Sequence, residues 1–423
     1  MSKETKPLAS DMKEYDSRQD MLRDLVSPGA ILAEIGVFAG DFAEWMLKSL
    51  QPKTLYGIDP YTSTIGVMGS GDVNGYNMEY FELDLLHGFV RNRLSPYPAF
   101  VQKREFSGDF FKNQDDGSLD AVYIDGDHSL EAVKADLNAA RYAVKEGGWI
   151  FGHDYSLHPT KGNPEIKHVT KEAVDAFCQE HGLTLYAVSN DGIRSFAIRN
   201  EHKYKICIVS LSDRPELYSK TFPLMHRYAE HHKYGVNLYG EVLDKDRHPS
   251  WSKIPALKLA LQENKYDYVV WMDDDIVITN PDISLSHFID KYNFRKSKAV
   301  VLVSSDMPNE PSTSMNCGIF FVKAKETKTT NLLNSAWAYA DACPILKQNL
   351  SWEQEAFNFL YRFMMREEFL IIPLPNFQAT TRFQSNQDVV WKPGAFAAHL
   401  NNGPLPMKLM TFALLQKTCS FLQ

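Results

Sequence analysis

The sequence is poor in cysteine and contains no CxxC pair. Its 423 residues include five cysteines, which are scattered along the chain: Cys178, Cys207, Cys317, Cys343 and Cys419. Disulfide scaffolds and cysteine-based zinc sites require paired or closely spaced cysteines. We therefore expect reduced thiols with a packing role, and neither a disulfide framework nor a zinc site.

Basic clusters and long apolar runs are also missing. The net charge is -8, and no group of lysine and arginine residues could follow a nucleic-acid backbone. No segment reaches the roughly 20 apolar residues of a membrane-spanning helix. The polar segment 1–20 lacks the apolar core of a signal peptide. We therefore expect no nucleic-acid partner, no membrane span and a cytoplasmic protein.

What the sequence does have is enough length for two domains. A chain of 423 residues with 44% hydrophobic residues exceeds what one core normally supports. Short apolar runs alternate with amphipathic stretches, and this alternation restarts after the polar segment 199–205. The pattern predicts two α/β domains, 1–203 and 204–423, with 1–28 as a polar, helical extension.

The expected elements follow from hydrophobic periodicity and turn residues. In the first domain we expect strands at 31–35, 54–58, 121–124 and 149–152, a helix at 129–144, and an antiparallel hairpin over 183–198. In the second domain we expect strands at 206–211, 236–239, 268–272, 299–303 and 319–322, and helices at 255–263, 329–339 and 353–365.

A glycine-containing turn, 34–40, follows the first strand. Glycine allows the backbone to approach a ligand closely, and the N–H groups of the helix that follows would face that ligand. Asp59 ends the next strand, about 20 residues further on, where doubly wound sheets bind ribose hydroxyls. The turn lacks the GxGxxG spacing of dinucleotide-binding folds, so it predicts another ligand with an anionic or carboxylate group.

Carboxylates and imidazoles follow two later strands of the same domain. Asp125, Asp127 and His128 follow the strand at 121–124, and His153 and Asp154 follow the next one. Because the carboxyl ends of parallel strands meet at one edge of the sheet, these groups should converge there. Solvated loops are the alternative interpretation, and two polar clusters on adjacent strand ends favour a site.

Together these motifs resemble the class I S-adenosylmethionine-dependent methyltransferases with a Rossmann-like fold, especially the magnesium-dependent sugar and small-molecule O-methyltransferases. The resemblance covers residues 30–198. It implies Mg²⁺ held by Asp125 and Asp154, and His128 as the base that deprotonates a sugar hydroxyl. Such relatives carry a carboxylate where this chain has His153, which leaves metal dependence open.

The same resemblance implies the residues that hold S-adenosylmethionine. They are Glu34, Gly36 and Gly40 at the methionine end with Val37 and Phe38 beside them, Asp59 at the ribose, Ser107, Gly108 and Asp109 in a turn at the adenine, and Asp125.

Three consecutive carboxylates, Asp273, Asp274 and Asp275, end an apolar strand of the second domain. Such a cluster should repel itself unless a cation is present, and a diphosphate leaving group needs the same cation. Alternate residues of an extended segment point the same way, so Asp273 and Asp275 would share the metal and Asp274 would point elsewhere. An acidic loop is one alternative. The other is a dehalogenase-like phosphatase, but its Asp-x-Asp motif opens the domain, whereas about 70 residues precede this one.

The motif position and four further segments resemble the GT-A glycosyltransferase fold, in particular the retaining α-galactosyl and α-xylosyl transferases, over residues 204–412. These segments are 251–255, 315–320, 352–356 and 398–399. The resemblance implies a nucleotide-sugar donor, linked to UDP or GDP, and a glycan acceptor. Relatives carry a basic residue soon after the late histidine, and here the first basic residue after His399 is Lys408.

The resemblance also implies the site residues of this domain. Asp273, Asp275 and His399 would hold Mn²⁺ or Mg²⁺, and Glu353 or Gln354 would lie near the anomeric carbon. The other substrate contacts it implies are Ser210, Ser212, Arg214, Trp251, Lys253, Asp274, Asp306, Asn316 and Gly318.

Two transferases in one chain predict a bifunctional glycan-modifying enzyme. The first domain would O-methylate a sugar that the second transfers or extends, because linkage raises effective concentration. We expect such a protein in the cytoplasm of a bacterium or of a virus-infected host cell. Two alternatives stay open: methylation of an unrelated small molecule, and a degenerate half that only binds a glycan or nucleotide.

Overall fold

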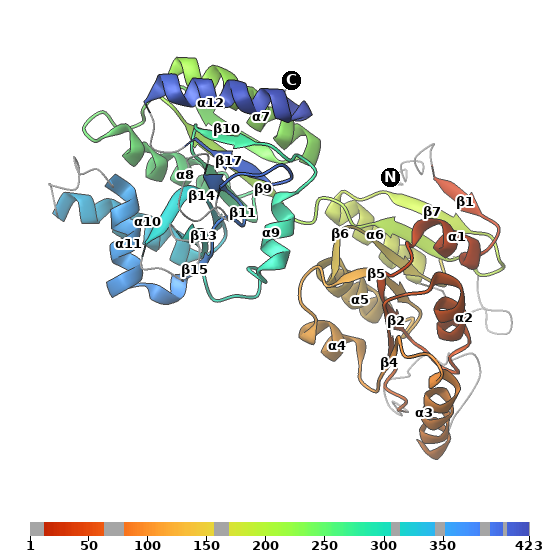
Figure 1. Cartoon of the computed structure of the whole chain (residues 1–423). Coiled ribbons are helices and arrows are strands. Elements are labelled where there is room, and N and C mark those ends of the chain that lie inside the picture. The colour runs from red at the N-terminus through yellow and green to blue at the C-terminus, as the bar shows by residue number, and fades with distance from the viewer. Residues whose placement is uncertain are drawn as a thin grey trace, which may run out of the picture. The chain divides into compact units, whose positions relative to one another are not determined.

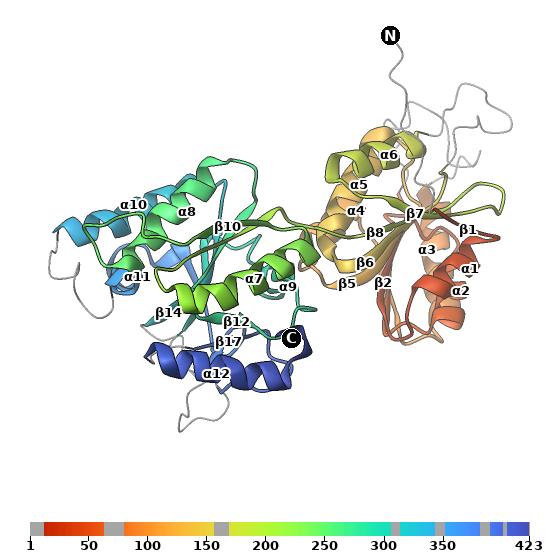
Figure 2. The same cartoon turned by 90° about the horizontal axis from the view of Figure 1, so that it is seen from above.

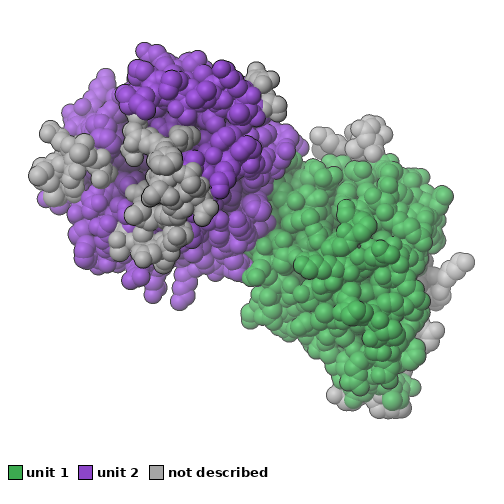
Figure 3. Space-filling view, viewed as in Figure 1, with its two compact units in different colours: residues 1–203 green, residues 204–423 purple. Residues whose placement is uncertain are grey.

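The computed structural model describes residues 12–62, 80–155, 169–305, 314–342, 352–380, 390–400 and 404–422. Asp306 and Cys343 lie outside these residues. The chain divides into two compact units, Met1–Lys203 and Tyr204–Gln423, which Figure 3 colours separately. Among the described helices, none combines the length and the apolar character needed to cross a membrane.

A mostly parallel sheet organises the first unit (Figure 1). Its strands are β1 (Lys13–Tyr15), β2 (Ile31–Ile35), β3 (Thr54–Ile58), β4 (Phe100–Lys103), β5 (Leu119–Ile124), β6 (Val144–Gly152), β7 (Leu185–Ser189) and β8 (Phe196–Arg199). They lie in the order β1-β7-β8-β6-β5-β2-β3-β4, and only β8 runs antiparallel to its neighbours. The strand order reverses between β2 and β5, which is where such sheets bind ligands.

Helices cover both faces of this sheet, as Figure 2 shows. The helices are α1 (Arg18–Leu25), α2 (Asp41–Leu50), α3 (Tyr80–Leu94), α4 (Ser107–Asn113), α5 (Leu130–Ala143) and α6 (Thr170–His181). α4, α5 and α6 pack on one face, and α1, α2 and α3 pack on the other. α5 illustrates the cause, because Val133, Leu137 and Ala140 recur at helical spacing and are buried.

The second unit contains a larger and a smaller sheet. The larger one comprises β9 (Ile206–Leu211), β10 (Gly235–Tyr239), β11 (Tyr268–Met272), β13 (Val301–Ser305), β14 (Met315–Lys323) and β15 (Phe369–Ile372). Their order is β10-β9-β11-β14-β13-β15, with β14 antiparallel to both of its neighbours. The smaller sheet has the order β12-β17-β16 and comprises β12 (Ile276–Ile278), β16 (Ala379–Thr380) and β17 (Ala397–His399).

The helices of the second unit form two groups. They are α7 (Pro215–His232), α8 (Lys253–Gln262), α9 (Leu285–Lys291), α10 (Thr327–Ala342), α11 (Trp352–Phe363) and α12 (Leu405–Thr418), with short 3₁₀ turns at Pro249–Ser252, Arg366–Glu368 and Ser420–Leu422. α8, α10 and α11 share the large core with β9, β11, β13 and β14. α7 and α12 pack with β12 and β17 in a separate cluster. The predicted fold class, two α/β domains, is confirmed.

Candidate active sites

The turn between β2 and α2 forms one wall of the first candidate site. Gly36 and Gly40 have φ values of 88° and 78°, in the left-handed region that favours glycine. A Cβ at Gly36 would lie 2.0 Å from the carbonyl oxygen of Asp125. Glycine is therefore required for the turn to pass so close to the loop after β5. Val37 is buried in this turn, and Phe38 is exposed with a φ of 48°.

Asp59 follows β3 and lies beside the glycine turn. Its two carboxylate oxygens accept hydrogen bonds of 2.9 Å from the backbone N–H groups of Phe38 and Tyr61. Burial raises the pKa of Asp59 above its ordinary value, although these bonds oppose the shift. Each oxygen keeps a further lone pair, so the carboxylate can still accept a ligand hydroxyl.

Glu34, at the end of β2, is buried at this site. Its Oε2 atom has no hydrogen-bond partner among the described residues. Burial, followed by the charge of Asp125, raises the pKa of Glu34 well above its ordinary value. An unsatisfied buried acceptor costs about 1–3 kcal/mol, so Glu34 is suited to accept a hydrogen bond from a bound amine.

Arg18 reaches the same site from α1, which the sequence analysis did not predict. Its guanidinium donates to the hydroxyl of Tyr123 (3.1 Å), lies 3.7 Å from a carboxylate oxygen of Asp125, and stacks over Phe42 at 4.5 Å. No motif marks Arg18, because it lies on α1 and not in one of the turns that follow the strands. It adds a cation where Glu34 and Asp125 supply carboxylates.

Asp125, His128 and Asp154 come together at the carboxyl edge of β5 and β6. One potential ligand atom from each lies within 4.8 Å of the others. Asp154 lies 3.0 Å from His128 Nδ1 and 3.1 Å from His153 Nδ1, and its φ is 58°. His153 Nδ1 also lies 3.7 Å from Asp125 Oδ1. The two imidazoles and two of the three carboxylates expected from the sequence therefore form one cluster. The third, Asp127, accepts a hydrogen bond of 2.8 Å from the backbone N–H of Ser129.

Burial governs the electrostatics of this cluster. It raises the pKa of Asp125, against the opposing charge of His153. Burial alone would lower the pKa of His153, but the hydrogen bond to Asp154 and the charge of Asp125 outweigh it and raise that pKa. Asp125 and His153 therefore both bind a proton more tightly than the same side chains would in water.

The predicted adenine-binding residues occupy the first turn of α4, not an isolated turn. Gly108 and Asp109 are exposed there. The hydroxyl of Ser107 is hydrogen-bonded to Asp136, a buried carboxyl group of α5. Burial raises the pKa of Asp136 to about 6.

In the second unit, the three consecutive aspartates lie between β11 and β12, and each is paired with a different cationic side chain. The pairs are Asp273 with Lys253 (3.2 Å), Asp274 with Arg214 (3.0 Å from Nε), and Asp275 with Lys408. The cations that this cluster was expected to need include side chains of the protein itself, because each carboxylate has a lysine or arginine beside it.

His399 reaches the aspartates through strand pairing. The register of β12 and β17 pairs Ile276 with His399, which places His399 Nε2 3.3 Å from Asp275 Oδ1. Single ligand atoms of Asp273, Asp275 and His399 lie within 4.8 Å of one another. Burial alone would raise the pKa of Asp275, but His399 and Lys408 outweigh it and hold the pKa far below its ordinary value.

Asp274 is directed away from this group, as strand geometry predicts. Besides Arg214, it accepts a hydrogen bond from the hydroxyl of Ser212. The backbone N–H of Arg214 in turn donates to Ser212 Oγ (3.0 Å). Two predicted nucleotide contacts thus lie beside the aspartates and hold Asp274 in place.

Lys253 links the metal-ligand candidates to the predicted reaction centre. Its buried ammonium donates to Glu353 Oε1 (2.6 Å) and to the carbonyl oxygen of Cys317 (3.1 Å), besides its pair with Asp273. The second carboxylate oxygen of Glu353 has no partner among the described residues. Burial raises the pKa of Glu353, although Lys253 opposes the shift. Gln354 Oε1 accepts from the N–H of Cys317 (3.2 Å).

Gln378, just before β16, is a site residue that the sequence did not indicate. Its amide donates to Asn316 Oδ1 (2.8 Å), which also accepts from the N–H of Gly318 (3.1 Å). Its own Oε1 is buried without a partner among the described residues. A Cβ at Gly318 would lie 2.6 Å from His399 Cε1 and 2.7 Å from Gln378 Oε1, so glycine is needed where β14 passes the histidine.

Trp251 and Ser210, which the sequence analysis assigned to substrate binding, are buried in the domain core. Trp251 is 0% exposed in the large core, edge-on to Trp337, and Ser210 is 0% exposed within β9. Neither offers a surface to a substrate, so direct contacts are not supported for them. Asp306 lies outside the described residues.

Comparisons with known proteins agree with this division. The profile of a methyltransferase domain matches residues 33–155, and the profile of the galactosyl transferase GMA12/MNN10 family matches residues 200–402. No curated protein sequence matches the chain.

Several solved structures show distant similarity. A glycosyltransferase involved in the glycosylation of the major capsid of PBCV-1 is 15% identical, with 50% of this chain and 99% of that chain covered and a TM-score of 0.41. Aeropyrum pernix fibrillarin, solved with S-adenosyl-L-methionine, is 12% identical, with 43% and 72% covered and a TM-score of 0.30. A SAM-dependent methyltransferase from Aquifex aeolicus is 13% identical, with 43% and 86% covered and a TM-score of 0.32. Likenesses this distant say nothing about substrates.

The two enzyme classes expected from the sequence are confirmed by the family profiles. The chain joins a methyltransferase domain to a glycosyltransferase domain of the galactosyl transferase GMA12/MNN10 family.

Proposed function

We propose that this protein is a bifunctional glycan-modifying enzyme, with residues 1–203 O-methylating a sugar and residues 204–423 transferring a sugar from a nucleotide-sugar donor. One observation carries the proposal: two separate groups of metal-ligand side chains, Asp125, His128 and Asp154 in one unit and Asp273, Asp275 and His399 in the other. Each group lies where the strands of its sheet end.

In the methyltransferase unit, the side chains around the glycine turn fit the methionine end of S-adenosylmethionine. The unsatisfied oxygen of buried Glu34 would accept from the amino group, and Arg18 would bind the carboxylate. Asp59 would accept from the ribose hydroxyls, as its free lone pairs allow. This ligand supplies an electrophilic methyl group.

His128 would act as the base toward the sugar hydroxyl. Its 3.0 Å contact with Asp154 orients the imidazole and stabilises it once it has taken the proton. Asp125 and Asp154 offer the oxygen ligands that Mg²⁺ prefers, and the ion would polarise the hydroxyl.

In the glycosyltransferase unit, Asp273, Asp275 and His399 would hold Mn²⁺ or Mg²⁺, which neutralises the diphosphate of the leaving nucleotide. The mixed oxygen and imidazole ligands fit such an ion. Lys408 is next to Asp275 and supplies the cation that relatives carry nearer the late histidine. Lys253 holds Glu353, whose free oxygen would face the donor sugar.

The test is a paired activity assay on the full chain. We expect S-adenosylmethionine to bind by calorimetry, and a UDP- or GDP-sugar to be hydrolysed or transferred only with Mn²⁺ or Mg²⁺. Asp125→Asn should lower methyl transfer, and Asp275→Asn glycosyl transfer, each by more than about 100-fold.

Each of these variants is the control for the other activity. Asp246→Asn, which changes an exposed carboxylate of the second unit, should leave both activities unchanged. Failure of every nucleotide sugar with every metal would refute the proposed glycosyl transfer. Full methyl transfer by Asp125→Asn would refute the proposed methylation site.

A further inference from the structure

A cleft lies at the amino-terminal ends of the parallel strands of the methyltransferase sheet, whereas the glycine turn lies at their carboxyl ends. It is lined where β5, β6 and β7 begin, by residues such as Asp120, Trp149 and Tyr186, and by the α1–β2 segment from Asp24 to Ala30. Asp120 is the second residue of β5 and Asp125 follows its last residue, so the two ends lie about 16 Å apart along the strand. The cleft is therefore separate from the proposed S-adenosylmethionine site.

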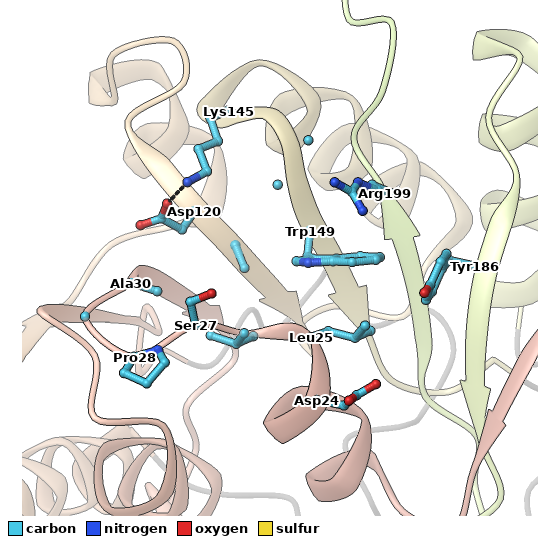
Figure 4. Close-up of a pocket in the computed structure, with 15 residues that line it drawn as sticks. Asp24, Leu25, Ser27, Pro28, Ala30, Asp120, Lys145, Trp149, Tyr186 and Arg199 are labelled. Atoms are coloured by element: carbon cyan, nitrogen blue, oxygen red, sulfur yellow. Dashed lines mark ion pairs between the residues drawn. The ribbon is translucent and has the colours of Figure 1, made fainter. Parts of the chain in front are cut away.

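The cleft has the dimensions of a ligand site. Its volume is about 650 Å³, within the roughly 300–1,000 Å³ typical of small-molecule sites. Figure 4 shows the indole of Trp149 reaching into it, with Arg199 and Leu25 on either side and Tyr186 beyond its edge. The register of β6 and β8 pairs Trp149 with Arg199, and Tyr186 meets the indole edge-on at 4.9 Å.

Several polar groups that line the cleft have no hydrogen-bond partner among the described residues. Within the described part of the chain, neither the Trp149 indole N–H, the Tyr186 hydroxyl nor the Ser27 hydroxyl makes a hydrogen bond. Arg199 forms a 3.5 Å ion pair from its Nε to Glu201 and lies over the Trp149 ring at 5.4 Å. Its terminal nitrogens have no hydrogen-bond acceptor among the described residues, so they can donate to a ligand. These groups can donate to several oxygen atoms of one ligand.

The charges that line the cleft cancel. Lys145 and Arg199 are balanced by Asp24 and Asp120, and Lys145 is already paired with Asp120. A phosphate-bearing ligand would find no net attraction here, and a purely apolar ligand would leave the polar groups unpaired. A neutral, hydroxyl-rich ring fits both the aromatic surface and the unused donors.

We infer that this cleft binds a neutral sugar unit of the glycan substrate, as a second site that keeps the substrate on the methyltransferase unit. The inference rests on the proposed function, which makes a glycan the available ligand. The cleft would then increase the affinity for the glycan and would take no part in the methyl transfer itself.

The test is saturation-transfer NMR and calorimetry on the full chain with methyl glycosides of glucose, galactose, mannose, xylose, fucose and rhamnose. Each is used at about 10 mM, ten times an expected Kd of about 1 mM. We expect at least one glycoside to bind, and Trp149→Ala and Arg199→Ala each to weaken it by about 10-fold or more.

Trp45→Phe, which alters a tryptophan of the same unit outside the cleft, should leave binding unchanged. Tyr186→Ala removes an exposed ring and provides the same test if Trp149→Ala does not fold. The inference is overturned if no glycoside binds, if the cleft variants bind as well as the wild type, or if AMP binds to the cleft in preference to the glycosides. Because S-adenosylmethionine binding and nucleotide-sugar turnover are measured separately, failure here is distinguishable from failure of the proposed function.

Discussion

Asp136 illustrates how a buried carboxyl group limits stability at neutral pH. Its pKa of about 6 exceeds the ordinary value of 3.8, so the folded state holds the proton more tightly than the unfolded state. Stability therefore falls as the pH rises from about 4 to 6, by up to about 3 kcal/mol, and stays low above pH 6.

Asp136→Asn should remove this penalty and keep a hydrogen-bond partner for Ser107. We expect a melting temperature up to about 6–12 °C above the wild type at pH 7.5, since 1 kcal/mol shifts the melting temperature of a domain of this size by about 2–4 °C, and no gain near pH 4. Thermal melts at both values check this. Asp115→Asn, at an exposed position, serves as the control, and an equal gain at both pH values would contradict the assignment to Asp136.

Arg18 supports a second prediction at the scale of single residues. Arg18→Ala removes the cation beside Asp125 and Tyr123, so the Kd for S-adenosylmethionine should rise by about 10-fold or more. Calorimetric titration measures this. Arg23→Ala, on the same helix and outside the site, is the matched control. Equal affinities for the two variants would show that Arg18 does not touch the ligand.

Single residues also show where sequence reasoning succeeded and where it failed. Asp273, Asp275 and His399 could be chosen because strand ends and motif order mark them, and the fold brings them together. Arg18 and Gln378 could not, because each reaches its site through contacts with residues far away in the sequence, such as the bond from Arg18 to Tyr123. Such packing leaves no local pattern.

At the scale of elements, β14 passes so close to His399 that a side chain at Gly318 would collide with the imidazole of this candidate metal ligand. Gly318→Ala would place a Cβ 2.6 Å from His399 Cε1 and displace the imidazole. We expect the affinity for Mn²⁺ to fall by about 10-fold or more, as measured by calorimetry. Gly240→Ala, whose Cβ would meet the nearest atom at 3.4 Å, is the control. Unchanged Mn²⁺ binding in Gly318→Ala would exclude His399 as a ligand.

Element prediction was reliable where periodicity was strong. Most strands of the two main sheets and the helices α5, α8, α10 and α11 lie at or near their predicted positions, since apolar spacing determines them. The strands β1, β4 and β15 were not predicted, and they have only three or four residues each. The small sheet was not predicted, because β12, β16 and β17 have only two or three residues each. α7 was also missed, and it contains Pro223, which normally indicates a break in a helix.

At the scale of the whole molecule, two compact units predict two separate responses to ligands. S-adenosylmethionine should raise the midpoint temperature of one calorimetric transition, and UDP with Mn²⁺ should raise that of the other. At a ligand concentration of 100 times Kd, each ligand should increase the free energy of unfolding of its own unit by about 2.7 kcal/mol. Separate chains of 1–203 and 204–423 would assign the transitions. A single transition shifted by both ligands would show that the units unfold together.

The pairing of every aspartate between β11 and β12 with a lysine or arginine has a consequence for how the protein matures. Structural zinc modules collapse when the ion is chelated, because the ion completes their core. Here the built-in ammonium and guanidinium groups already balance the acids, so the polypeptide can reach its native state before any ion arrives. With the proposed metal site, scarcity of divalent ions would lower glycosyl transfer without unfolding the domain, and activity would return once the ion is supplied again.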